Sequence, residues 1–359
     1  MSPTYHRRSA LRLILTTVAA LSLCAAPAAA STLVITGAGD GHGVGMSQDG
    51  ALGYAQHGAT YSAILAHYYT GTALGQAPAG AVVRVLVGAK VEKIPLERYV
   101  RGVVSAEMPS SWPLPALEAQ AVASRTYALT AHAGGSRFDV YADTRSQVYR
   151  GAIAETAQTN TAVTATAGQI VTYAGQPATT YFFASSGGMT ESIANSFLGS
   201  TPEPWLVGVA DPYDSGPAYD WKISMSFATA TARLKGLLNG TFRGIEVLRR
   251  GVSPRIISAA VLGTRGDTNV SGPALAARLG LQSTWEFFSV KNGKTVTAEP
   301  DTSSQPGPPP ATASPAPSGP QGGAQAPGAP ESTTVAEPGG GAQAAGSSEP
   351  TLAGGAAAE

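Results

Sequence analysis

The chain has 359 residues, and its 23 basic and 23 acidic side chains give a formal net charge of zero at neutral pH. Domains that bind nucleic acid concentrate Lys and Arg, so this balance argues against a nucleic-acid partner. The chain contains a single cysteine, Cys24. This count excludes an internal disulfide and a zinc site built from several thiolates.

The first thirty residues have the composition of a secretory signal peptide. A basic start precedes the apolar stretch 13–23, and small residues follow up to Ala30. A basic segment, an apolar run of about 7–15 residues and an Ala-x-Ala site are typical of a cleaved signal. We therefore predict a signal peptide over residues 1–30 and a secreted protein that is extracellular or associated with the cell wall. After cleavage we expect no membrane span.

Residues 32–72 predict a strand, a glycine-rich loop and two helices. The strand is expected at 32–36 and the loop at 37–45. The first helix is expected at 46–57. The second is expected at 61–68, because its apolar residues recur at i, i+3, i+4 and i+7.

Two helices with clear boundaries are predicted after a strand at 81–87. The first begins at Pro95 and runs toward Glu107. The second covers 114–133, because it is rich in alanine, has a proline near its start and meets two glycines at its end.

The later elements are short and do not follow a regular βαβ rhythm. They are strand-like pieces at 138–141 and 147–149, a helix at 154–167, strands at 169–173 and 179–184 around a turn at Gly175, a helix at 226–238, a hairpin or meander over 244–250 and 255–262, and a helix at 271–279. Ser271 is predicted to cap the last helix. The pattern predicts an α+β fold, in which mixed strands and helices form a two-lobed domain with a substrate cleft.

The carboxyl-terminal segment 296–359 is rich in Pro, Gly, Ala, Ser and Thr and contains no Lys or Arg. Such a segment buries too little apolar surface to offset the entropy of ordering, so we predict a disordered tail. The expected domain organisation is a signal peptide at 1–30, an N-terminal segment at 31–75 that packs on the main domain, a catalytic domain at 81–290 and the tail.

Glu107 is the candidate catalytic residue on physical grounds. It follows Val103 and Val104, and Trp112 lies nearby in the sequence. A carboxyl group among apolar side chains resists ionisation, so its pKa should rise toward neutrality. A general acid that protonates a glycosidic oxygen requires such a pKa. A solvent-facing glutamate at a helix end is the ordinary alternative.

Several motifs together resemble one known family. The blocks are LERYVRGVVSAEMP at 96–109, SWP at 111–113, ALEAQAVASRTYA at 116–128, QVYRG at 147–151, SSGGMTE at 185–191, VSGP at 270–273 and LGLQST at 279–284. They resemble the signature of the stage II sporulation protein D family, which carries the SpoIID/LytB domain. The likeness covers residues 81–290, and its most specific part lies at 96–128.

The resemblance implies a lytic transglycosylase that acts on the glycan strands of peptidoglycan. The acidic residue of its Glu-Met-Pro triplet is here Glu107, and Gln120 and Arg125 map to residues that hold the sugar. The resemblance also makes Ser185 and Ser186 candidates for substrate contact. Most glycosidases need two carboxyl groups. One is enough here, because the C6 hydroxyl of the sugar replaces the attacking water. Asp139, Asp143 and Glu191 stay open as a second acid.

A second block of the same family lies near the amino end. It comprises GHGVGMSQDGA at 41–51 and ILAHYYTGT at 64–72. Many members carry this motif at the end of the domain, so the motif order here looks circularly permuted. His42, Ser47 and Gln48 are expected to hydrogen-bond sugar hydroxyls, with a structural loop as the alternative. No metal and no cofactor are expected, because the mature chain has no cysteine and no His-Glu-x-x-His motif.

Two other functions remain open for this sequence. The family includes proteins named amidase enhancers, so a non-catalytic protein that binds peptidoglycan and stimulates a partner cell-wall amidase is the main alternative. The second open function is that of a structural wall protein in which the tail acts as a spacer.

Overall fold

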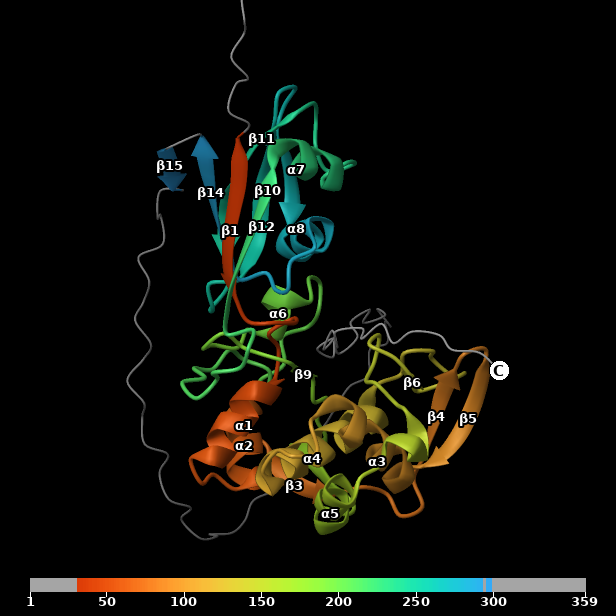
Figure 1. Cartoon of the computed structure of the whole chain (residues 1–359). Coiled ribbons are helices and arrows are strands. Elements are labelled where there is room, and N and C mark those ends of the chain that lie inside the picture. Colours follow the sequence, from red (N-terminus) through yellow and green to blue (C-terminus); the bar gives the residue numbers. More distant parts are fainter. Residues whose placement is uncertain (1–30, 293–294, 299–359) are drawn as a thin grey trace, which may run out of the picture.

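The computed structural model describes residues 31–292 and 295–298, which form two groups of elements with separate hydrophobic cores (Figure 1). We call residues 39–219 the helical lobe, and residues 32–38 together with the described residues from 220 onward the sheet lobe. Both lobes combine helices and strands, so the predicted α+β class is confirmed. The predicted signal peptide and the tail beyond 298 lie outside the described residues. Among the described residues, no helix is both long and apolar enough to cross a membrane.

The helical lobe contains most of the helices and several small sheets. Its elements are β2 (Met46–Ser47), α1 (Gln48–Gln56), α2 (Tyr61–Tyr68), β3 (Ala73–Gln76), β4 (Val82–Val87), β5 (Lys90–Pro95), α3 (Leu96–Glu107), α4 (Leu114–Thr130), β6 (Val140–Tyr141), the 3-10 turn η1 (Gly151–Ala154), α5 (Ala157–Ala165), β7 (Gln169–Tyr173), β8 (Gln176–Pro177), β9 (Phe182–Phe183) and α6 (Ile193–Ser196). The strands pair in the orders β3-β7-β8 and β5-β4-β6, and β2 pairs with β9.

The sheet lobe is built from two antiparallel sheets with two helices. Its elements are β1 (Thr32–Ala38), β10 (Asp220–Ser226), α7 (Phe227–Arg233), β11 (Phe242–Arg250), β12 (Ile256–Gly263), β13 (Thr268–Ser271), α8 (Gly272–Leu279), β14 (Glu286–Asn292) and β15 (Thr295–Ala298). One sheet has the order β10-β1-β14-β15 and the other β11-β12-β13. The expected catalytic domain at 81–290 thus contains parts of both cores, and β15 reaches into the range expected for the tail.

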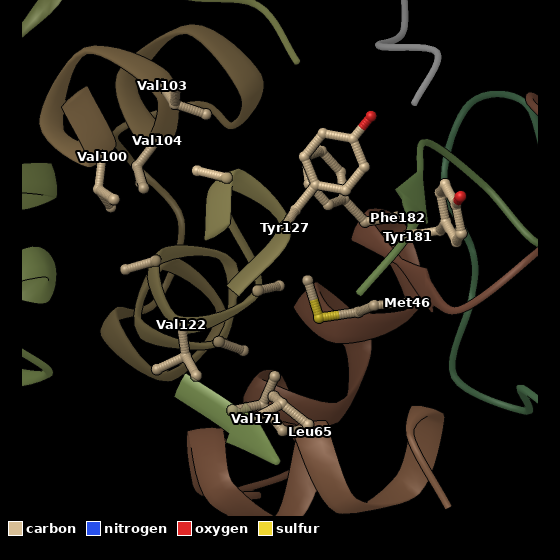
Figure 2. Packing of buried hydrophobic residues seen from close by; sticks show 14 of the residues in the cluster. Met46, Leu65, Val100, Val103, Val104, Val122, Tyr127, Val171, Tyr181 and Phe182 are labelled. Carbon is tan, nitrogen blue, oxygen red and sulfur yellow. The ribbon is translucent and has the colours of Figure 1, made fainter. Parts of the chain in front are cut away.

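Helix α4 forms the centre of the helical lobe. It is contacted by α1, α2, α3, α5 and β7, and nearly every residue from Ala116 to Ala128 is buried. Small alanine side chains let these neighbours approach from several sides, which explains the absence of a polar face. Figure 2 shows side chains of this core, among them Val103 and Val104 of α3 and Val122 of α4.

Several expected elements differ from the structure, and two of them lie in or next to the core helix α4. Helix α4 ends at Thr130 rather than at 133, because the N–H groups of Ala133 and Gly134 bond to the carbonyls of Asp139 and Phe138 in a turn. The expected strand pair around Gly175 is also different. β7 pairs with β3 and β8, whereas β9 is a two-residue strand parallel to β2.

Glu286 should make the stability of the protein depend on pH. The side chain is fully buried, and both carboxyl oxygens lack a hydrogen-bond partner among the described residues. Burial raises the pKa of Glu286 well above its usual value. The unfolded chain therefore ionises this group first, so its contribution to stability is complete below the ordinary glutamate pKa and is lost as the pH rises through the native pKa.

The variant Glu286→Gln should flatten this dependence. Urea unfolding is measured at several pH values from about 4 to about 9, a range that spans the ordinary glutamate pKa. As the pH rises, the free energy of unfolding should fall less for the variant than for the wild type. Glu246→Gln, at an exposed position of β11, is the matched control and should retain the wild-type slope. Equal slopes for wild type and Glu286→Gln would contradict the prediction.

Candidate active site

Glu107 is the last residue of α3 and continues the buried face of that helix. Val100, Val103 and Val104 are fully buried, and Glu107 follows them at the same three- and four-residue spacing. Met108 is extended and Pro109 comes next, so the helix ends at Glu107. The sequence therefore places one carboxyl group at the end of an apolar stripe.

Both oxygens of the Glu107 carboxyl accept hydrogen bonds. The main-chain N–H of Val148 donates to Oε1 over 2.5 Å. The side-chain amide of Gln48 donates to Oε2 over 3.4 Å. These donors come from the loop after β6 and from the start of α1, so segments distant in sequence meet at this carboxyl. The 147–149 segment, expected as strand-like, forms no strand, and the Val148 N–H serves the carboxyl instead.

The protonation of Glu107 is set by opposing effects. Burial raises the pKa of Glu107 to about 7, although the hydrogen bonds from Val148 and Gln48 and the positive charge of Arg150 favour the ionised form. Near neutral pH the carboxyl can therefore both donate and accept a proton. This is the property required of a single general acid and base.

Gln48 and Gln120 lie together next to this carboxyl. The Gln48 amide nitrogen is 3.5 Å from Oε1 of Gln120 and 3.4 Å from the main-chain oxygen of Glu107. The Gln120 amide in turn donates to Oγ of Ser124 over 2.9 Å. Two of the expected site residues thus gather around Glu107, one from α1 and one from α4.

The three serines expected to contact substrate have another partner. The hydroxyls of Ser47, Ser185 and Ser186 donate to the carboxylate of Asp214 over 2.8–3.3 Å. The N–H groups of Ser186 and Gly187 donate to the same carboxylate. All three serines are fully buried. Their hydroxyls bond to Asp214 inside the protein and hold its loop, and the expected sugar contacts of these serines stay a prediction.

His42 is enclosed by aromatic side chains rather than placed against Glu107. Its ring packs against Tyr181, Phe183 and Phe197 at centroid distances of 5.0–6.0 Å. Its Nδ1 accepts the N–H of Val44 over 3.0 Å. Burial lowers the pKa of His42 to about 3, so the ring is neutral. These contacts fit the structural alternative for this motif. Nε2 of His42 has no hydrogen-bond partner among the described residues, and its bond to a sugar hydroxyl stays a prediction.

Arg125 also has a structural environment. Its guanidinium is fully buried and forms a two-bond ion pair with Glu97, with N–O distances of 2.7 and 2.8 Å. It also donates to the main-chain oxygen of Gln169 over 2.9 Å. Arg125 therefore joins α3, α4 and β7 through donors that are used within the core, and the expected sugar contact stays a prediction.

The other candidate acids are held by partners of their own. Asp139 is paired with Arg84 and Asp143 with Arg145. Glu191 accepts hydrogen bonds from the main chain and hydroxyl of Ser253. Among the described residues, no group of three or more His, Cys, Asp or Glu side chains is arranged to hold a metal ion.

Comparison with known proteins agrees with the motifs. The model of the SpoIID family, described as stage II sporulation protein, matches residues 88–173. Stage II sporulation protein D of Bacillus subtilis (strain 168) is 30% identical over 225 residues, which cover 58% of this chain and 64% of that protein. These matches confirm the resemblance to the stage II sporulation protein D family, whose domain the chain carries over residues 88–173.

Two further relatives share a shorter region with this chain. An uncharacterized protein of Brachyspira hyodysenteriae is 37% identical over 140 residues, 38% of each chain. A protein named amidase enhancer from Bacillus subtilis is 38% identical over 127 residues, 35% of this chain and 17% of that protein. The chain thus spans less than two thirds of the length of each of these curated relatives.

The region matched by the SpoIID model contains most but not all of the site. Glu107, Gln120 and Val148 lie within 88–173, whereas Gln48 precedes it. The circular permutation inferred from this motif order stays a prediction. The role of Asp214 was missed, because its loop at 211–217 carries no periodicity or motif that marks a buried carboxylate.

Proposed function

We propose that this SpoIID-family protein is a lytic transglycosylase that cleaves the bond between N-acetylmuramic acid and N-acetylglucosamine in peptidoglycan. The observation that carries the proposal is the half-buried carboxyl of Glu107. Desolvation raises its pKa to about 7, and Val148 and Gln48 hold its oxygens. A carboxyl with this pKa is protonated in a large fraction of molecules at neutral pH.

The proposed reaction uses that proton twice. Protonated Glu107 gives its proton to the glycosidic oxygen, and the bond between this oxygen and C1 of the muramic acid breaks. The C6 hydroxyl oxygen of the same sugar bonds to C1, and its proton passes to the Glu107 carboxylate. The products are a free C4 hydroxyl on the glucosamine and a 1,6-anhydromuramic end. No second carboxyl is needed, because no water is activated.

The cell wall as the site of action is supported by the family and by one relative. A protein named amidase enhancer shares 38% identity over 127 residues with this chain. That relative favours the second candidate function, a non-catalytic peptidoglycan-binding protein that stimulates a partner amidase. A half-buried carboxyl with a near-neutral pKa favours the enzyme, because binding alone does not require a proton donor.

Cleavage should decline at alkaline pH. Protonated Glu107 is the active form for the first step, and its pKa is about 7. Above that pH the protonated fraction falls about tenfold per pH unit, and kcat/KM should fall in parallel. Release of soluble glycan fragments from purified sacculi, measured from mildly acidic to alkaline pH, checks this. A rate that stays constant well above pH 7 would exclude Glu107 as the proton donor.

The reaction itself is tested by product analysis. Purified sacculi, with and without prior removal of stem peptides, are incubated with the protein, and the fragments are examined by mass spectrometry. We expect anhydromuramic ends. Reducing ends instead would indicate hydrolysis. If neither glycan is cut, an amidase assay with and without added protein tests the second function.

A further inference from the structure

Glu107 has two hydrogen-bond donors of different kinds. The Val148 donor belongs to the main chain and is present whatever side chain occupies that position. Among the side chains that the structure describes, only Gln48 hydrogen-bonds to the Glu107 carboxyl. The orientation of Oε2 of Glu107 therefore depends on the side chain of Gln48. Because a side chain can be replaced by mutation, the contribution of Gln48 can be measured.

Gln48 is held in place by the start of α1. The residue is 3% exposed and directly follows Ser47, whose hydroxyl caps α1 by accepting the N–H of Gly50 over 3.1 Å. The same hydroxyl donates to Asp214 over 3.3 Å. A Cβ at Gly50 would lie 2.1 Å from the Tyr68 hydroxyl oxygen, so glycine permits the close packing of α1 at this point. The amide thus reaches Glu107 from a fixed backbone.

The uncharged nature of the donor is chemically significant. A Lys or Arg at this distance would hold the pKa of Glu107 far below neutrality and leave no proton to donate. A side chain without a donor would leave the ionised carboxyl with only the Val148 N–H. A neutral amide lies between these cases, because it supports the carboxylate without preventing its protonation.

We propose that Gln48 is a positioning residue for Glu107, and that its amide orients the carboxyl for proton donation and stabilises the carboxylate that remains after proton transfer. The proposal deepens the function proposed above and rests on it for the catalytic consequence. It differs from the sugar contact expected from the sequence, because the Glu107 carboxyl is one of the acceptors of the amide, beside the main-chain oxygen of Glu107 and Oε1 of Gln120. It also implies that the site is incomplete without the segment that precedes the matched region.

The test is the variant Gln48→Met, which keeps the length of the side chain and removes its amide. Carbon NMR of the Glu107 carboxyl, assigned by comparison with Glu107→Gln, follows its titration without any substrate. The midpoint should move up by about half a pH unit, as expected for the loss of one long hydrogen bond to a carboxylate. Glycan cleavage should be about tenfold slower, with the alkaline limb of its pH profile displaced in the same direction.

The matched control is Gln56→Met at the exposed end of the same helix, which should keep the wild-type midpoint. If Gln48→Met does not fold, Gln48→Glu retains the shape and should raise the midpoint, because a second carboxyl replaces the donor. An unchanged midpoint in the folded variant overturns the proposal, even when cleavage is slower. A wild-type protein that cuts no glycan overturns the proposed function instead, and the midpoint still decides whether Gln48 controls the protonation of Glu107.

Discussion

The variant Glu107→Gln should lose glycan cleavage by a factor of about 10²–10⁴, the contribution expected of a positioned general acid. Glutamine has nearly the same shape and can still accept the Val148 N–H through its oxygen, so the fold around α3 should persist. It cannot give up a proton at neutral pH. The rate of anhydromuramic end formation from purified sacculi measures the effect, and circular dichroism verifies the fold.

Glu92→Gln is the control for this variant, because Glu92 is an exposed residue of β5 in the same lobe. It should cleave at the wild-type rate. Full activity in Glu107→Gln would assign the proton transfer to another group. Asp49 would be the next candidate, since burial and the nearby Asp214 and Asp40 raise the pKa of Asp49 to about 7.

The second large effect is expected from Arg125→Met, which should lower the free energy of unfolding by about 3 kcal/mol. The fully buried guanidinium pairs with Glu97, whose side chain is 38% exposed, and also bonds to the carbonyl of Gln169. Methionine can fill the space but removes the guanidinium donor from both partners, and Glu97 keeps, among the described residues, only the N–H of Gly168. The loss is at the lower end of the range for buried pairs, because water can reach Glu97. Urea unfolding measures it.

Arg98→Met on the exposed side of α3 serves as the comparison and should change stability by less than about 0.5 kcal/mol. Below the unfolding transition, Arg125→Met should retain the wild-type KM for glycan, because its side chain lies in the core. A raised KM with unchanged stability would restore the sugar-binding role that the family resemblance implied.

The helices around the site could be predicted because their signals are local. The apolar spacing that leads to Glu107 and the run of alanines in α4 are visible in the sequence, as is the cap at Ser271, and all three are found in the structure. The raised pKa expected for Glu107 from its apolar neighbours is also present. Each of these inferences needed only residues within a few turns of one another.

The partners of the polar site residues could not be predicted in this way. Ser186 and Asp214 are 28 positions apart, and Arg125 and Glu97 also lie 28 positions apart. Whether a buried serine or arginine faces a ligand or a neighbouring carboxylate depends on tertiary packing, which a sequence motif does not reveal. The family motif marked these residues, and their contacts in the structure are internal to the protein. Their roles in sugar binding stay predictions.

The position of β1 has a consequence for the order in which the protein matures. This first described strand lies between β10 and β14, and pairs along its length with both. Leu33 and Ile35 are therefore covered only after the last part of the folded chain has been synthesised. Such distant pairing is slow to form. During synthesis, β1 therefore stays unpaired until β10 and β14 have been made. We expect this apolar strand to need protection from aggregation during that time.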